Sequence, residues 1–184
     1  MMPNCGAGSQ PAAASQAASL AAGGGTPRAP RTLVIGYGNS LRGDDGAGPY
    51  IASRLGAGAK RLGADAIACH QLTPELAEPI SQAQQVIFVD AHAGVPPGQI
   101  AIEPVRPRLS AAIHRFEPET LLAWSQQLYG RAPEAILIGI GGESFDLGEG
   151  LSPQARRAVR EALRAIRKLS ASLAANGGTI PVSQ

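Results

Sequence analysis

The stretch Leu-Val-Ile-Gly-Tyr-Gly-Asn-Ser-Leu-Arg-Gly-Asp-Asp-Gly-Ala-Gly, residues 33–48, decides the fold of this chain. It opens with apolar residues that belong to a predicted strand over 32–36, short and buried on both faces. The glycines that follow allow a sharp turn off this strand. A helix is predicted from Pro49 to about Leu55, entered through Gly46-Ala47-Gly48. A buried strand, a glycine-rich turn and a helix in this order are typical of an α/β fold.

Strands and helices alternate along the rest of the chain. Continuous apolar runs predict strands that helices cover on both sides. We therefore predict a three-layer α/β/α domain with a mainly parallel, twisted, five-stranded sheet. Further strands are expected over 65–70, 86–90, 100–102 and 135–140, and further helices over 74–80, 118–129 and 152–175. Thr73 is a candidate N-cap of the helix over 74–80, and Gly130 is expected to end the helix over 118–129.

The two ends of the chain differ in composition from the middle. Residues 1–30 are rich in Ala, Gly, Ser and Pro and contain almost no large apolar side chain, so we expect a disordered low-complexity tail. The folded domain is expected over 31–176, and 177–184 are expected to form a flexible C-terminus.

Charge and cysteine content narrow the function classes. The formal net charge is only +2, and no basic run is interleaved with aromatic residues, so we expect no nucleic-acid partner. The arginines of 156–167 fall at helical spacing and are interpreted as a solvated helix face. No apolar run reaches the length of a membrane helix. Cys5 and Cys69 form no disulfide framework, which favours a reducing cytoplasm.

Two adjacent aspartates, Asp44 and Asp45, stand at the end of the glycine-rich stretch. A dinucleotide fingerprint fails here because the glycine spacing is wrong and carboxylates would repel a pyrophosphate. One aspartate is expected to cap the following helix, since Asp is a favoured cap. Because a cap does not need two carboxylates, the other is a candidate for metal binding or proton transfer.

Two further residues complete a candidate site. Asp90 ends an apolar strand, where ligands of parallel sheets bind, although an aspartate there also serves turns. His114 precedes a predicted helix, where a lone histidine is more often a surface or capping residue. Together Asp45, Asp90 and His114 offer two carboxylates and an imidazole, a pattern typical of an open metal site.

Three motifs of this chain resemble the signatures of the hydrogenase maturation proteases. Residues 33–48 closely resemble the opening signature of that family, and Phe88-Val89-Asp90-Ala91 resembles the second. The stretch from His114 through Leu121-Leu122 to Leu128-Tyr129-Gly130 resembles the third. The resemblance covers about residues 31–170 and implies a twisted, mainly parallel sheet between helices.

The resemblance implies an endopeptidase that removes the C-terminal extension of a NiFe hydrogenase large-subunit precursor after nickel insertion. Carried over by motif, the metal-contacting and catalytic residues are Asp45, Asp90 and His114. Many members have glutamate at the first position, so Asp45 is a shorter variant of it. The nickel is expected to come with the substrate, and no other cofactor is expected. Residues 70–76 resemble the branch associated with soluble, bidirectional, NAD-linked hydrogenases.

Several alternatives stay open at this point. Nickel could be catalytic or only a recognition element, and Asp45 with Asp90 could instead form an acid–base carboxylate pair. The same sheet could carry a non-catalytic metal- or nucleotide-binding module. The chain could also be a chaperone that holds the hydrogenase precursor without cutting it.

Removal of residues 1–28 tests the predicted domain boundary. Because this segment lacks core-forming side chains, the shortened protein should unfold at nearly the same urea concentration as the full chain and should retain its activity. A shortened protein that fails to fold would place the segment inside the domain.

Overall fold

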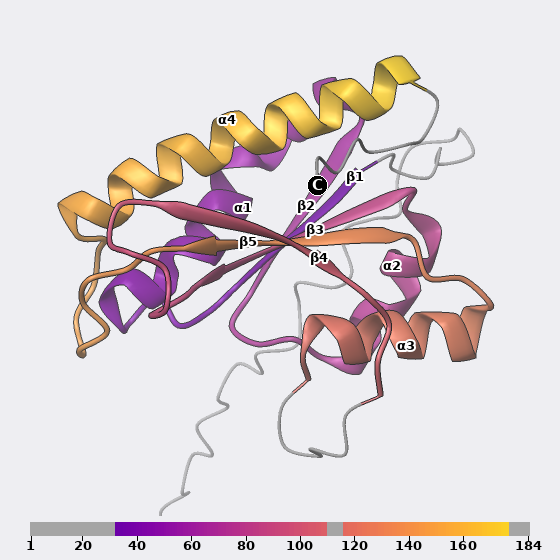
Figure 1. Ribbon diagram of the computed structural model, residues 1–184, viewed down its shortest axis with the longest axis horizontal. Coiled ribbons are helices and arrows are strands. Elements are labelled where there is room, and N and C mark those ends of the chain that lie inside the picture. Colours follow the sequence, from indigo (N-terminus) through magenta and orange to yellow (C-terminus); the bar gives the residue numbers. More distant parts are fainter. Residues whose placement is uncertain (1–31, 110–115, 177–184) are drawn as a thin grey trace, which may run out of the picture.

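The structure is a computed structural model that describes residues 32–109 and 116–176 (Figure 1). The expected tail over 1–30, the expected C-terminus over 177–184 and the candidate residue His114 lie outside the described residues.

The predicted five-stranded, mainly parallel sheet is confirmed. Its strand order is β2-β1-β3-β5-β4, and the first four strands run parallel. The edge strand β4 pairs antiparallel with β5. The strands are β1 (Thr32–Tyr37), β2 (Ala64–Cys69), β3 (Gln85–Ala91), β4 (Ile100–Val105) and β5 (Glu134–Ile140).

Helices cover both faces of the sheet, which gives the predicted three layers (Figure 1). None of the helices described is both long enough and apolar enough to span a bilayer. The α-helices are α1 (Ala47–Ala59), α2 (Ala77–Gln82), α3 (Pro118–Tyr129) and α4 (Pro153–Asn176), and short 3-10 turns occupy η1 (Gly43–Gly46), η2 (Lys60–Leu62) and η3 (Pro74–Leu76).

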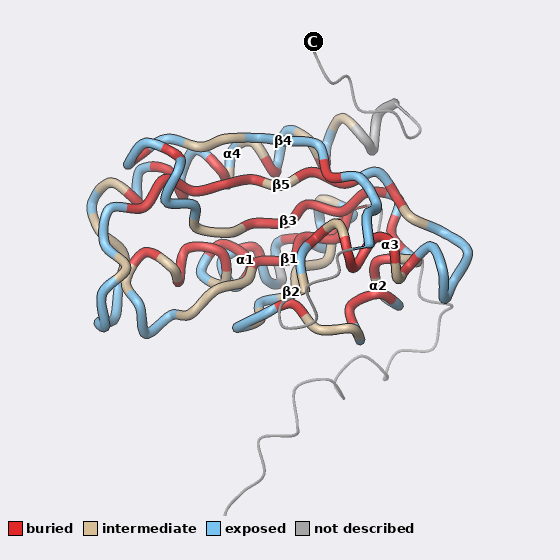
Figure 2. The backbone as a smooth tube through the Cα atoms, turned by 60° about the horizontal axis from the view of Figure 1, so that its bottom comes forward, coloured by how far each residue is buried: buried red, intermediate tan, exposed pale blue. Residues whose placement is uncertain are grey.

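The alternation of side chains along the strands divides the core into two halves. On one face, Val34 and Ile87 pack in a cluster with residues of α1 and α4. On the other face, Leu33 and Phe88 pack in a cluster with residues of α2 and α3. Because successive strand residues point to opposite sides, an apolar run such as that of β3 contributes to both clusters. Figure 2 shows the resulting burial, continuous through the central strands and lower at β4.

The element bounds differ from the predicted ones where local geometry intervenes. The first helix begins at Ala47 and continues past Leu55 to Ala59 across a kink at Gly56. The helix predicted over 74–80 is split into η3 and α2, and Thr73 makes no side-chain cap hydrogen bond. Gly130 ends α3 as predicted, with a left-handed backbone at φ 72°.

Glycines bring β1, α1 and the intervening loop into close contact. A Cβ atom at Gly36 would overlap the carbonyl oxygen of Gly48, so strand and helix touch through their backbones. Gly38 has φ 136°, and a Cβ atom there would overlap the carbonyl oxygen of Asp45. Only glycine permits both the backbone angle and the approach. The loop is thereby folded over the carboxyl end of β1, with Asp45 placed beside Gly38.

Gly38→Val should destabilise the protein by about 3 kcal/mol or more, because a branched side chain meets both a strained backbone angle and a backbone oxygen. Gly58→Val is the matched control, since nothing lies within 4 Å of a Cβ atom at this helical glycine. Urea unfolding of both variants measures the difference. Equal losses would mean that the close approach at Gly38 does not constrain the fold.

Candidate functional site

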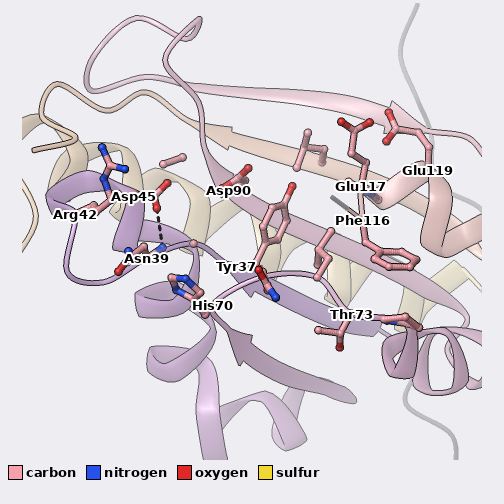
Figure 3. A pocket seen from close by; sticks show the side chains of 17 residues that line it. Tyr37, Asn39, Arg42, Asp45, His70, Thr73, Asp90, Phe116, Glu117 and Glu119 are labelled. Carbon is pink, nitrogen blue, oxygen red and sulfur yellow. Dashed lines mark hydrogen bonds between the residues drawn. The ribbon is translucent and has the colours of Figure 1, made fainter. Parts of the chain in front are cut away.

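A polar cleft of about 780 Å³ opens at the carboxyl ends of β1, β2 and β3 (Figure 3). Its walls come from the loops after these strands and from the start of α3. This is the edge at which parallel sheets bind ligands. The cleft is lined by Tyr37, Gly38, Asn39, Arg42, Asp45, His70, Gln71, Leu72, Thr73, Pro74, Asp90, Ala91, Phe116, Glu117, Pro118, Glu119 and Leu137.

Asp45 and Asp90, predicted as site residues, both line this cleft. Asp45 is half-buried within η1, and its Oδ2 accepts a hydrogen bond of 2.7 Å from the backbone N–H of Asn39 (Figure 3). The Asn39 side chain in turn accepts a hydrogen bond of 2.9 Å from the Leu41 N–H. The loop therefore fixes the orientation of the Asp45 carboxylate.

The carboxyl group of Asp90 has a raised pKa. Burial at the end of β3 raises the pKa of Asp90 from its ordinary value of 3.8 to about 6, and the nearby Asp45 charge adds to the increase. A hydrogen bond with Tyr37 and one with the Ala91 backbone limit the rise. A carboxyl group with a pKa raised in this way is suited to act as a general acid or base.

Tyr37 is the hydrogen-bond partner of Asp90, and it was not among the residues predicted from the sequence to form the site. Burial, together with the neighbouring Asp90 charge, raises the pKa of the Tyr37 phenol far above its ordinary value. The phenol therefore stays protonated and acts as a hydrogen-bond donor to Asp90. Its place at the end of β1, inside the motif that carries Asp45, was the available sequence signal.

Asp44 has a structural role that differs from the predicted one. Neither Asp44 nor Asp45 caps the following helix, because no side-chain cap hydrogen bond occurs at η1 or α1. Instead, the fully buried Asp44 carboxylate accepts hydrogen bonds from the backbone N–H groups of Glu143, Ser144 and Ser152 at 2.8, 3.1 and 2.6 Å. The Ser152 hydroxyl donates a fourth at 2.8 Å. Asp44 thus ties the site loop to the start of α4.

These contacts leave Asp45, rather than Asp44, facing the cleft. Burial alone would raise the pKa of Asp44, but the hydrogen bonds from Glu143, Ser152 and Ser144 lower it overall. Asp44 therefore remains charged and is fully occupied by protein donors. The sequence could not show this, because its partners lie about a hundred residues further along the chain.

The third predicted residue, His114, lies outside the described residues. The chain is described again from Phe116, and Phe116, Glu117 and Glu119 line the cleft. Phe116 is held by an edge-to-face contact with Trp124 of α3, at 5.4 Å between ring centroids. Within 32–109 and 116–176, no group of three His, Cys, Asp or Glu side chains is arranged to hold a metal ion.

The charge of the cleft is a feature that sequence reasoning missed. Asp45, Asp90, Glu117 and Glu119 line it, whereas Arg42 is its one arginine or lysine among the residues described. The two glutamates flank Pro118 at the start of α3. An acidic cleft favours a cation or a basic peptide over a phosphate.

Comparison with solved structures shows which proteins share this fold. The chain superposes on the NiFe hydrogenase maturation protease HycI of Thermococcus kodakarensis KOD1 with a TM-score of 0.61 and 24% identity over 78% of this chain and 93% of that chain. It matches the hydrogenase 2 maturation peptidase of Thaumarchaeota archaeon SCGC_AB-539-E09 with a TM-score of 0.57 and 25% identity over 75% and 96% of the two chains. For the hydrogenase maturating endopeptidase HybD of E. coli the TM-score is 0.57, with 22% identity over 80% and 94%.

No protein-family model matches the chain. No curated protein matches it either. The structural matches confirm the resemblance predicted from the motifs: this chain has the α/β fold of the hydrogenase maturation proteases. In that fold, the cleft described above holds two of the three residues that the motifs single out.

Asp90→Asn should raise the thermal stability at pH 8. A folded-state pKa of about 6, above the ordinary 3.8, means that ionised Asp90 destabilises the fold at high pH, by roughly 1–3 kcal/mol. This cost disappears as the pH falls from about 6 to below 4, so the melting temperatures of variant and wild type should converge in acid.

Asp44→Asn is the control, and its effect on thermal stability at pH 8 should have the opposite sign. The lowered pKa of Asp44 gives stability that is present above its ordinary pKa and is lost in acid, so this variant should melt well below wild type at pH 8. Melting curves at several pH values test both. A lower melting temperature for Asp90→Asn at pH 8 would contradict the assigned burial cost.

Proposed function

We propose that this chain is an endopeptidase that removes the C-terminal extension of a NiFe hydrogenase large-subunit precursor after nickel insertion. One observation carries the proposal. Asp45 of η1 and Asp90 at the end of β3 line one cleft in a fold shared with proteases of this class. The solved structures that it matches include a maturation protease and a maturating endopeptidase, and this chain carries Asp45, Asp90 and His114 in the motifs that resemble that family.

His114 completes the proposed site. In the sequence it stands two residues before Phe116, which lines the cleft. Two carboxylates and an imidazole are acceptable ligands for nickel. In this proposal the nickel belongs to the substrate, and Asp45, Asp90 and His114 contact it when the precursor enters the cleft. The metal would then polarise the scissile carbonyl or activate a water molecule.

A carboxylate-pair mechanism is the second candidate, and the raised pKa of Asp90 favours it. One protonated and one ionised carboxyl group can share acid and base roles in peptide hydrolysis. Asp45 and Asp90 interact electrostatically, and Asp90 has a pKa of about 6. In that case nickel would serve only to recognise the mature precursor.

The acidity of the cleft argues against the nucleotide-binding alternative. Four carboxylates line it with one arginine, and a phosphate group would be repelled. The chaperone alternative shares the cleft but lacks the cutting step, so only a cleavage assay separates it. For the substrate class, the resemblance of residues 70–76 to the branch associated with soluble, bidirectional, NAD-linked hydrogenases favours a precursor of that type. His70, Gln71 and Leu72 of this stretch line the cleft, where they could contact the precursor.

The decisive experiment is mass spectrometry of nickel-loaded and nickel-free precursor after incubation with the protein. Wild type should shorten the loaded precursor. Asp45→Asn, Asp90→Asn and His114→Ala should each reduce the rate by about a hundredfold or more, as expected for essential catalytic groups. Glu75→Gln is the matched control, since this exposed carboxylate neighbours Pro74 of the cleft but does not line it.

The outcomes separate the mechanisms. Equal cleavage with and without nickel would exclude a catalytic metal and leave the carboxylate pair. Full activity of His114→Ala with loss in both aspartate variants would remove His114 from the site. A precursor that binds but is never shortened would identify a chaperone.

A further inference from the structure

A second hollow lies between α1 and α4, the two helices that cover one face of the sheet. Its volume is about 270 Å³, with side chains from the first half of α4 and from the start and middle of α1. We call it the arginine groove. It is lined by Tyr50, Arg54, Arg156, Val159, Arg160 and Leu163.

The lining of the arginine groove combines three guanidinium groups with an apolar floor and contains no carboxylate. Arg54, Arg156 and Arg160 are exposed. Arg156 Nε donates a hydrogen bond of 2.9 Å to the Leu151 carbonyl oxygen, which holds that side chain at the start of α4. Val159 is part of the core, so the base of the groove is rigid and apolar.

The surroundings of the groove are also basic. Along the exposed side of α4, one acidic residue, Glu161, stands among the arginines and the lysine of residues 156–168. The cleft at the carboxyl ends of the strands has the opposite charge, with four carboxylates and one arginine. The two hollows therefore attract segments of opposite charge.

Both hollows lie toward the same end of the molecule. Ser152, which directly precedes α4, donates to the Asp44 carboxylate, and Asp44 is adjacent to Asp45 of the cleft. Tyr50 lies five residues after Asp45, which corresponds to roughly 8 Å along a helix. A partner whose chain enters the cleft can thus reach the arginine groove without spanning the whole domain.

We propose that the arginine groove docks an acidic, partly apolar segment of the same hydrogenase precursor whose C-terminal extension enters the cleft. The inference rests on the proposed function. Guanidinium groups bind carboxylates through paired hydrogen bonds, and Tyr50, Val159 and Leu163 supply apolar contact for side chains between them. This mixture suits an acidic peptide better than a polyphosphate backbone, which has no apolar side chains.

The first test is binding of a labelled peptide of alternating Glu and Leu, followed by fluorescence anisotropy. Arg156→Glu/Arg160→Glu should weaken binding by about tenfold or more, because it reverses two charges in the groove. Arg164→Glu/Arg167→Glu is the matched control, with the same charge change at exposed positions of α4 outside the groove lining, and should weaken binding by less than about threefold. Arg54→Glu changes the charge that α1 contributes to the same groove and should also weaken binding of the peptide.

The second test is cleavage kinetics on the nickel-loaded precursor. Arg156→Glu/Arg160→Glu should raise KM about fivefold with little change in kcat, and the difference should shrink above about 0.5 M salt, where charges are screened.

Equal effects of the groove and control variants would overturn the proposal in favour of general charge attraction. Tighter binding of a single-stranded oligonucleotide than of the peptide would overturn it in favour of nucleic acid. If wild type cleaves no precursor, the proposed function fails. Groove-dependent peptide binding would still support the acidic-segment site in that case.

Discussion

The candidate site depends on the hydrogen bonds that the buried Asp44 carboxylate accepts. This carboxylate accepts four hydrogen bonds from the segment 143–152 and joins the first loop of the domain to the last. A buried charge is tolerated only when donors surround it, and loss of those donors leaves a large desolvation cost. Further bonds reinforce the junction, including Asp44 N–H to the Ser144 carbonyl oxygen and Gly43 N–H to the Gly148 carbonyl oxygen. The position of Asp45 follows, because its neighbour is anchored.

Two hollows of opposite charge lie at different places on the mainly parallel sheet. At the carboxyl ends of β1, β2 and β3, the loops meet the start of α3 and form an acidic cleft. On the face that α1 and α4 cover, these two helices pack against the sheet and expose arginines. Asp44 lies between the two regions and bonds to Ser152, whose hydroxyl also accepts a hydrogen bond from the Ala155 N–H in the first turn of α4. The acidic and basic surfaces are therefore held in a fixed relation by one buried network.

The fold raises the pKa of the Asp90 carboxyl group through burial and a neighbouring charge. Its position at the end of β3, directly after five buried residues, shields it from water, and the Asp45 charge opposes its ionisation. Tyr37 limits the shift by donating a hydrogen bond, so the pKa lies near neutrality rather than higher. Three residues from two motifs thus act together, although each taken alone has an ordinary structural interpretation as a cap, a turn residue or a strand end.

The sequence by itself determined the order of the strands and helices along the chain and the candidate residues Asp45 and Asp90. Apolar runs such as 86–89 indicate burial, and the glycines around Gly38 indicate a backbone that needs unusual freedom. Both are local properties, so the sequence shows them without knowledge of which residues lie nearby in space. Only the tertiary structure decided the role of Asp44, the pKa of Asp90, the acidity added by Glu117 and Glu119, and the pairing of Arg54 with Arg156 and Arg160 in one groove. These properties arise between residues tens of positions or more apart, and electrostatics and hydrogen bonding depend on distance in space rather than on distance along the chain.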